Sequence, residues 1–219
     1  MFASTTTFAL LSLLGLSAAA PTPVELAPRC GSLSYPVLLQ QFSEAHPTTV
    51  YPNTHPINGD FHVSREMDPV TGKVSNRISQ MVMFKDIPAG SYGCQLNVAF
   101  PANYPITTTG NPVLNVYTFY SGTDPAYIPY PNNWSWDTFY PRSETNPAPF
   151  GEGVFGTINF APGQTTVINS EACPYGGGDV AFVFEIADWV WGSASIEFEE
   201  YSSAILDEGK AGVYLTYDC

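Results

Sequence analysis

The chain has 219 residues, and 7 Lys and Arg against 20 Asp and Glu give it a formal net charge of −13. This balance disfavours a nucleic acid or an anionic membrane as partner, because no cluster of basic side chains is present to neutralise phosphates. The acidic surface is also typical of a soluble monomer kept apart by charge repulsion.

Residues 1–20 have the pattern of a secretory signal peptide. The apolar run from Phe8 to Leu16 is too short to span a bilayer, and Ala18 and Ala20 suit signal peptidase. We expect cleavage after Ala20, a Pro-rich linker over residues 21–32 and one domain over residues 33–219. No later segment is long and apolar enough to cross a membrane, so we expect a secreted, extracellular protein.

Four cysteines remain after this cleavage, and in an exported chain they are expected to form two disulfides with three possible connectivities. Because the termini of a domain often lie close together, we expect Cys30 to pair with Cys219. Cys94 then pairs with Cys173. None of the four stands in a CxxC pair, which argues against a zinc site.

Four prolines interrupt residues 33–63 and limit this region to short or edge strands, of which residues 61–66 are one. The clearest signal follows at residues 78–100, where two strands flank a Pro/Gly turn at residues 86–90. In the second strand Cys94, Leu96 and Val98 alternate with polar or small residues. This pattern predicts a β-hairpin with an inward-facing cysteine.

The rest of the chain continues as short strands. Residues 121–152 form the longest irregular stretch and combine aromatic residues with prolines. In the last strand Val213, Leu215 and Cys219 share a parity, which predicts a second inward-facing cysteine. With about nine strands and no convincing helical period, we expect an all-β, antiparallel β-sandwich or jelly-roll-like single domain. The further strands are expected at residues 113–120, 154–160, 165–169, 179–187, 194–201 and 213–219.

Several segments resemble one family. They are DIPAGSYGCQL at residues 86–96, YPI at 104–106, LNVY at 114–117 and GVYLTYDC at 212–219. These segments are similar to those of the But-two C-terminal-like domain, which is found mostly in secreted fungal proteins, and the resemblance spans roughly residues 33–219. It implies a β-sandwich and export, and it implies no catalytic residues.

Two tryptophan pairs are the most suggestive functional feature. Trp134 with Trp136, and Trp189 with Trp191, are each two residues apart, which in extended backbone sends both indoles to one side. Flat apolar rings beside an acidic acceptor such as Asp137 are suited to stacking on sugars. We therefore expect a non-catalytic domain that binds glycan or a cell-wall surface, with Tyr130 of the same loop as a further candidate. The alternative is that these aromatics anchor the loop and the core.

Carboxylates offer an enzyme alternative, an acid-active extracellular hydrolase. Glu197 and Glu199 are one pleat apart, about 6 to 7 Å between Cα atoms, so their carboxyl groups fit the separations that glycosidases use. Glu185 shares its strand with apolar neighbours, where burial would raise the pKa of its carboxyl group. Ordinary solvent-facing polar patterning explains Glu197 and Glu199 equally well.

The remaining motifs indicate no metal and no cofactor. His46, His55 and His62 fit no recognised ligand spacing, and no nucleophile elbow, phosphate loop or dinucleotide fingerprint is present. Asn133 begins the sequon Asn-Trp-Ser and is a candidate N-glycosylation site. A third hypothesis is a surface or host-interaction protein that binds a protein partner through an exposed apolar patch.

Overall fold

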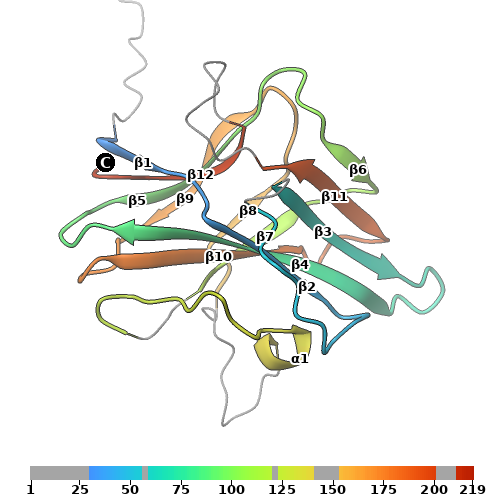
Figure 1. Ribbon diagram of the computed structural model, residues 1–219. Coiled ribbons are helices and arrows are strands. Elements are labelled where there is room, and N and C mark those ends of the chain that lie inside the picture. The colour runs from blue at the N-terminus through green and yellow to red at the C-terminus, as the bar shows by residue number, and fades with distance from the viewer. Residues whose placement is uncertain (1–29, 56–58, 120–122, 141–152, 201–210) are drawn as a thin grey trace, which may run out of the picture.

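The computed structural model describes residues 30–55, 59–119, 123–140, 153–200 and 211–219 (Figure 1). The predicted signal peptide and residues 21–29 of the predicted linker lie outside this described part. The ordered strands begin at Ser32, the last residue of that linker. The elements are β1 (Ser32–Ser34), β2 (Leu38–Ser43), β3 (Asp60–Met67), β4 (Val74–Ile87), β5 (Cys94–Ala99), β6 (Thr107–Thr109), β7 (Leu114–Phe119), α1 (Trp136–Phe139), β8 (Gly156–Ile158), β9 (Thr165–Glu171), β10 (Gly178–Ile186), β11 (Ala194–Glu199) and β12 (Gly212–Tyr217).

The strands form two antiparallel sheets in a sandwich-like arrangement, which confirms the predicted fold class. Sheet A has the order β1-β12-β5-β9, and sheet B has the order β6-β11-β3-β4-β10-β7-β8. Strand β2 pairs with β4 outside that order. Figure 1 shows the two layers, with β1, β5 and β12 on one side and the long strands β4 and β10 crossing the other.

The predicted β-hairpin at residues 78–100 is wrong, because its two strands belong to different sheets. β4 pairs with β2, β3 and β10 in sheet B, whereas β5 pairs with β9 and β12 in sheet A. The Pro/Gly turn therefore carries the chain from one layer to the other. The residues of β4 explain this placement: Val82 and Phe84 face the inter-sheet core, and Met81 and Met83 are buried on the opposite face. A strand buried on both faces needs the interior of the larger sheet.

Two hydrophobic clusters hold the fold together. The larger one lies between the sheets and is rich in phenylalanine, with Phe61 stacked on Phe198 at a ring distance of 4.5 Å and on edge to Phe184 at 5.3 Å. The second cluster covers the outer face of sheet B, where Phe42 stacks on Phe139 of α1 at 4.2 Å. Residues 123–140 thus form a third, partial layer, which Figure 1 shows beneath β2, β4 and β10.

The disulfides join Cys30 with Cys219 and Cys94 with Cys173, the pairs that the sequence led us to expect. Cys94 is buried, as its strand pattern predicted, but Cys219 is exposed. The prediction of an inward-facing Cys219 fails because β12 ends at Tyr217 and Asp218 has a positive φ of 60°. This turn breaks the alternation that places side chains on one face of a strand.

No helix in the described residues is long and apolar enough to cross a membrane.

Candidate functional site

Trp189 and Trp191 stand on the turn between β10 and β11, and their side chains are 63% and 75% exposed. Val190 between them is buried and packs in the inter-sheet core. The buried valine fixes the backbone and leaves the two flanking indoles on the surface. We call residues 187–193 the Trp turn.

The Trp turn is held to β3 by hydrogen bonds at both ends. At its start, Arg65 Nη1 donates to the carbonyl oxygen of Ala187 over 3.2 Å. At its end, the backbone N–H of Met67 donates to Ser193 Oγ over 3.0 Å, and the N–H of Gly192 lies 3.2 Å from the Met67 sulfur. A loop anchored in this way presents its tryptophans in a fixed position, which lowers the entropy cost of binding a ligand.

The β3–β4 turn supports Trp191 from below. A Cβ atom built on Gly72 would lie 3.4 Å from the Trp191 ring atom Cη2, so the indole lies beside this glycine. Asp68 shapes the same turn, because its Oδ1 accepts hydrogen bonds from the N–H groups of Val70 and Thr71, both at 2.8 Å. The exposed Val70 extends the apolar surface at this end of sheet B.

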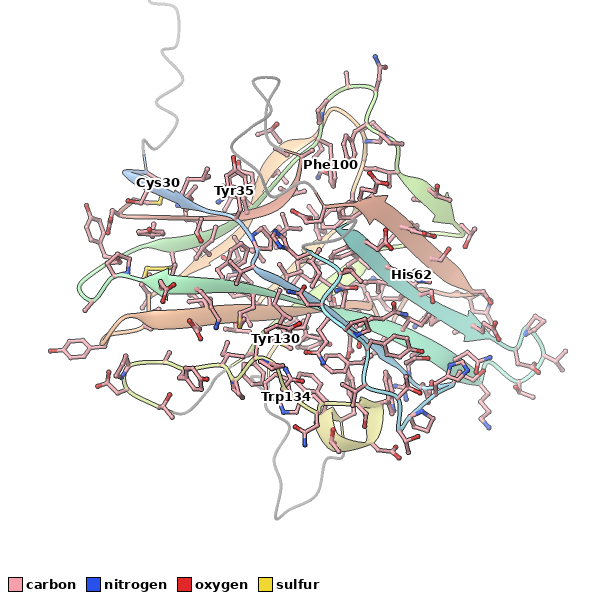
Figure 2. All side chains as sticks on the ribbon, in the orientation of Figure 1. Cys30, Tyr35, His62, Phe100, Tyr130 and Trp134 are labelled. Carbon is pink, nitrogen blue, oxygen red and sulfur yellow. A yellow bond between two sulfur atoms is a disulfide. The ribbon has the colours of Figure 1, made fainter. Side chains whose placement is uncertain are left out.

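A groove of about 500 Å³ begins where the Trp turn ends. Its walls come from β2, β3, β4, β6 and β11 of sheet B, from the segment after β2 and from the end of the Trp turn, and they carry several hydroxyl groups and two imidazoles. Figure 2 shows His62, one of these groups, on β3. We call this the polar groove, and it is lined by Ser43, Ala45, His46, Tyr51, His62, Ser64, Arg65, Glu66, Asn76, Ile78, Thr109, Ser193, Ala194 and Ser195.

The histidines were considered in the sequence only as metal ligands, and their role in a groove was missed. His46 and His62 are 16 positions apart, and only the fold brings both to one surface. His55 is apart from them, and burial lowers the pKa of its imidazole. Within the described residues no group of three His, Cys, Asp or Glu side chains is placed to hold a metal ion.

Trp134 and Trp136 do not form a second exposed pair. The ring of Trp134 lies 5.4 Å from Phe119 and 5.6 Å from Phe139, within the second hydrophobic cluster. Trp136 stacks on Tyr140 at 4.1 Å, and the Arg77 guanidinium lies over the Trp136 ring, 5.1 Å from its centroid. Extended backbone was the wrong assumption here, because α1 begins at Trp136.

The other candidates of this loop are not among the residues that line the polar groove. Tyr130 is 39% exposed, and the exposed Asp137 is in the first turn of α1, where its backbone N–H donates to the carbonyl of Pro47. Asn133 is exposed, as a glycosylation site must be. Ser135 of the same sequon is buried and takes part in the capping box of α1.

The three candidate glutamates are not brought together. Glu197 and Glu199 are exposed on β11. The residues that alternate with them, Ile196 and Phe198, face the core. Glu185 is on β10, three strand spacings or about 14 Å from β11 in sheet B. It lines a separate cavity of about 90 Å³ with Arg65, Arg77 and Asp188, among others.

A different carboxylate, Glu171, was missed by the sequence reasoning. It is at the end of β9 and lines a pocket of about 530 Å³ together with Asp124, Tyr175 and Asp179. Burial raises the pKa of Glu171 to about 6, against an opposing hydrogen bond from the Thr118 hydroxyl. In the sequence Glu171 looks like an ordinary polar strand residue. Its position two residues before Cys173 is the one indication that it lies near a disulfide.

Comparison of the chain with protein-family models finds no match, and comparison with curated proteins also finds none.

Proposed function

We propose that this protein is a non-catalytic carbohydrate-binding domain, and that its binding surface is the Trp turn with the adjoining polar groove. The observation that carries the proposal is the exposure of Trp189 and Trp191 on an anchored turn. Trp189, Trp191 and the neighbouring Val70 expose apolar surface at one end of sheet B, and contiguous apolar surface on a monomer often marks a binding site.

The two parts of this surface complement each other chemically. Indole rings offer flat apolar faces for the C–H faces of sugar rings, and they lose little conformational entropy on binding. Hydroxyl and imidazole groups act as both donors and acceptors, as sugar hydroxyls do. Ser193 and Ser195 continue directly from the Trp turn into the groove, so one oligosaccharide is able to contact both parts.

The setting is consistent with an extracellular role. Two disulfides indicate an oxidising environment, and the free energy they contribute is retained outside the cell. Secretion, a monomeric state and membership of the But-two C-terminal-like family are parts of the same proposal. The residues at 86–96 and 212–219 carry the resemblance on which that membership rests.

The test is binding of the mature protein to neutral polysaccharides and oligosaccharides, measured by pull-down and by titration calorimetry. We expect retention on at least one glycan, reduced about tenfold or more by Trp189→Ala or Trp191→Ala. Tyr175→Ala is the matched control, because it removes a 93% exposed aromatic ring that lines the Glu171 pocket instead of the polar groove. Absence of binding to every glycan, or equal loss from the control, would overturn the proposal.

A second candidate is an acid-active hydrolase, now centred on Glu171 instead of the Glu197 and Glu199 pair. A carboxyl group with a pKa of about 6 remains protonated in mild acid and is able to serve as a general acid. The same pocket holds Asp124 and Asp179. The test is release of reducing sugar from a polysaccharide at pH 4 to 6. Activity that is lost in Glu171→Gln but kept in Glu199→Gln would favour hydrolysis over binding alone.

A further inference from the structure

A continuous row of side chains crosses the polar groove from strand to strand. The strand register pairs Thr109 of β6 with Ser195 of β11, Ser195 with Ser64 of β3, Ser64 with Ile78 of β4, and Ile78 with Ser43 of β2. Each of these residues lines the groove. Four strand spacings of about 4.8 Å make the row about 19 Å long. We call it the hydroxyl row, because all its side chains except that of Ile78 carry a hydroxyl group.

The alternation of the strands directs the middle of the row away from the core. Val63 on β3 and Ile196 on β11 pack in the inter-sheet cluster, so Ser64 and Ser195 point to the opposite side of their strands. Thr109 Oγ1 and Ser195 Oγ are 2.7 Å apart, which places these two neighbours on the same face. The hydroxyl groups of the row therefore face one common surface.

Ser43 is the buried end of the row. It is only 3% exposed, whereas Thr109 at the other end is exposed. Phe42 packs in the second hydrophobic cluster, so Ser43 points to the other side of β2, where its register partner Ile78 lines the groove. Among the described residues Ser43 Oγ has no hydrogen-bond partner, and unlike the unpaired His55 Nε2 it is not fully covered. Because buried polar groups are normally paired, this hydroxyl is available to a ligand in the groove.

The row is one side chain wide and has polar groups along both flanks. His62 and Glu66 stand two residues before and two residues after Ser64 on β3, and both line the groove. The Asn76 side chain donates to Glu66 Oε2 over 2.7 Å and holds that flank in place. A long, narrow track of this kind suits an extended, unbranched chain.

We propose that the polar groove binds a linear, neutral oligosaccharide along the hydroxyl row, across the strands, with one sugar hydroxyl bound to Ser43 Oγ. This inference rests on the proposed carbohydrate-binding function and specifies its ligand as an unbranched chain of several sugars. Hydroxyl groups both donate and accept, so they match sugar hydroxyls in either direction. The net charge of −13 disfavours an acidic chain. From the row, the chain continues past Ser193 to the Trp turn.

The dependence of affinity on chain length tests the row. Titration calorimetry of the full mature protein uses cello-, N-acetylchito- and laminari-oligosaccharides of two to six sugars. In a series that binds, we expect the affinity to rise about tenfold or more from the disaccharide and then to level off, because each added sugar reaches a further strand until the row is filled. Equal affinity at every length, or retention on a polysaccharide without binding of any linear oligosaccharide, overturns this inference and leaves the proposed function intact. No binding of any form, with no polysaccharide retained, overturns both.

Variants separate Ser43 from the Trp turn. Ser43→Ala should lower the affinity for the longest chains about tenfold, as for one lost hydrogen bond, and leave that for the disaccharide unchanged. Its urea unfolding midpoint should not change, because the hydroxyl has no partner in the free protein. Trp191→Ala should weaken the binding of chains of every length.

Ser79→Ala is the matched control for Ser43→Ala. Ser79 is also buried, but it accepts a hydrogen bond from the Tyr140 hydroxyl and does not line the polar groove. Its replacement should lower the unfolding midpoint and leave the affinity unchanged. Full affinity of Ser43→Ala for the longest chains would overturn the assignment of Ser43.

Discussion

Both carboxylate oxygens of Glu200 lie within hydrogen-bonding distance of the backbone N–H of Val213, at 2.8 and 2.9 Å. Glu200 is 4% exposed and follows β11, while Val213 is in β12, so the contact joins the two sheets. Burial raises the pKa of Glu200 well above its ordinary value, and the Val213 N–H offsets only part of this effect. Burial therefore favours the neutral form of this carboxyl group in the folded protein.

Stability should therefore fall as the pH rises. A carboxyl whose pKa is higher in the folded state binds its proton more tightly there, so its contribution is complete below about pH 4.5 and is lost on raising the pH. For Glu171 the loss ends near pH 6 and amounts to no more than about 2 kcal/mol, because its partial exposure reduces the effect. For Glu200 the loss of stability continues to higher pH.

Urea unfolding at pH 4.5, 6 and 7.5 measures this dependence. Glu171→Gln should reduce the pH dependence of stability between pH 4.5 and 6, and Glu200→Gln should reduce it over that range and at higher pH. Glu44 is the opposing control: its hydrogen bond from Arg77 lowers its pKa, so its contribution is lost only as the pH falls below about 4.5. Stability that rises steadily from pH 4.5 to 7.5 would contradict the assignment of Glu171 and Glu200.

Removing either disulfide should destabilise the protein strongly. In the chain-entropy model, opening the 189-residue link Cys30–Cys219 costs about 5 kcal/mol, and opening the 79-residue link Cys94–Cys173 costs about 4.5 kcal/mol. The second pair is also buried, so its double serine variant adds hydroxyl groups to the core and should be the less stable of the two. Urea denaturation of the two double variants tests this order. The exposed Cys219 should also be alkylated first during graded reduction.

The two tryptophan pairs should differ in their effect on stability. Trp134→Ala removes a ring that packs on Phe119 and Phe139, and we expect a loss of about 2 to 3 kcal/mol in the free energy of unfolding. Trp191→Ala should cost less than about 1 kcal/mol, because its side chain is largely exposed. Denaturant titration of both variants provides the comparison. Equal losses would mean that Trp191 has a structural role.

Asn53 should be one of the most sensitive polar positions. Its Oδ1 accepts hydrogen bonds from the N–H groups of Leu39 and His55, and its Nδ2 donates to the carbonyl of Val37, all at 2.9 to 3.0 Å. Asn53→Ala leaves these buried groups unpaired and should cost about 2 to 3 kcal/mol. The exposed Asn103→Ala serves as control and should leave the unfolding midpoint unchanged. A small effect at Asn53 would show that water replaces the amide.

Export and glycosylation are testable together. Expression of the full chain in a eukaryotic secretory host should release protein that begins at Pro21 and carries a glycan on Asn133. N-terminal sequencing identifies the cleavage site, and an endoglycosidase mass shift that is absent in Asn133→Gln identifies the glycan. Retention of the chain inside the cell would contradict the proposed secretion.

Much of the secondary structure was predictable because strand alternation is a local property. Leu96 and Val98, and Ile196 and Phe198, face the core as their parity predicted. The disulfide pairing was predictable from the proximity of domain ends. The predicted β-hairpin failed, since the sequence of a turn fixes its local direction but not the sheet that receives the next strand.

Which residues form the candidate binding surface depended still more on the tertiary structure. Trp134 with Trp136 and Trp189 with Trp191 have the same spacing, yet only the second pair is exposed. Arg65 gave no signal in the sequence, and Glu171 gave only its position two residues before Cys173, because the environment of a side chain depends on residues far away in the chain. By itself the sequence determined an acidic, disulfide-linked, all-β domain, since composition and alternation act residue by residue. Only the packing of the two sheets decided which aromatic and charged side chains remain available to a ligand, because burial depends on the whole fold.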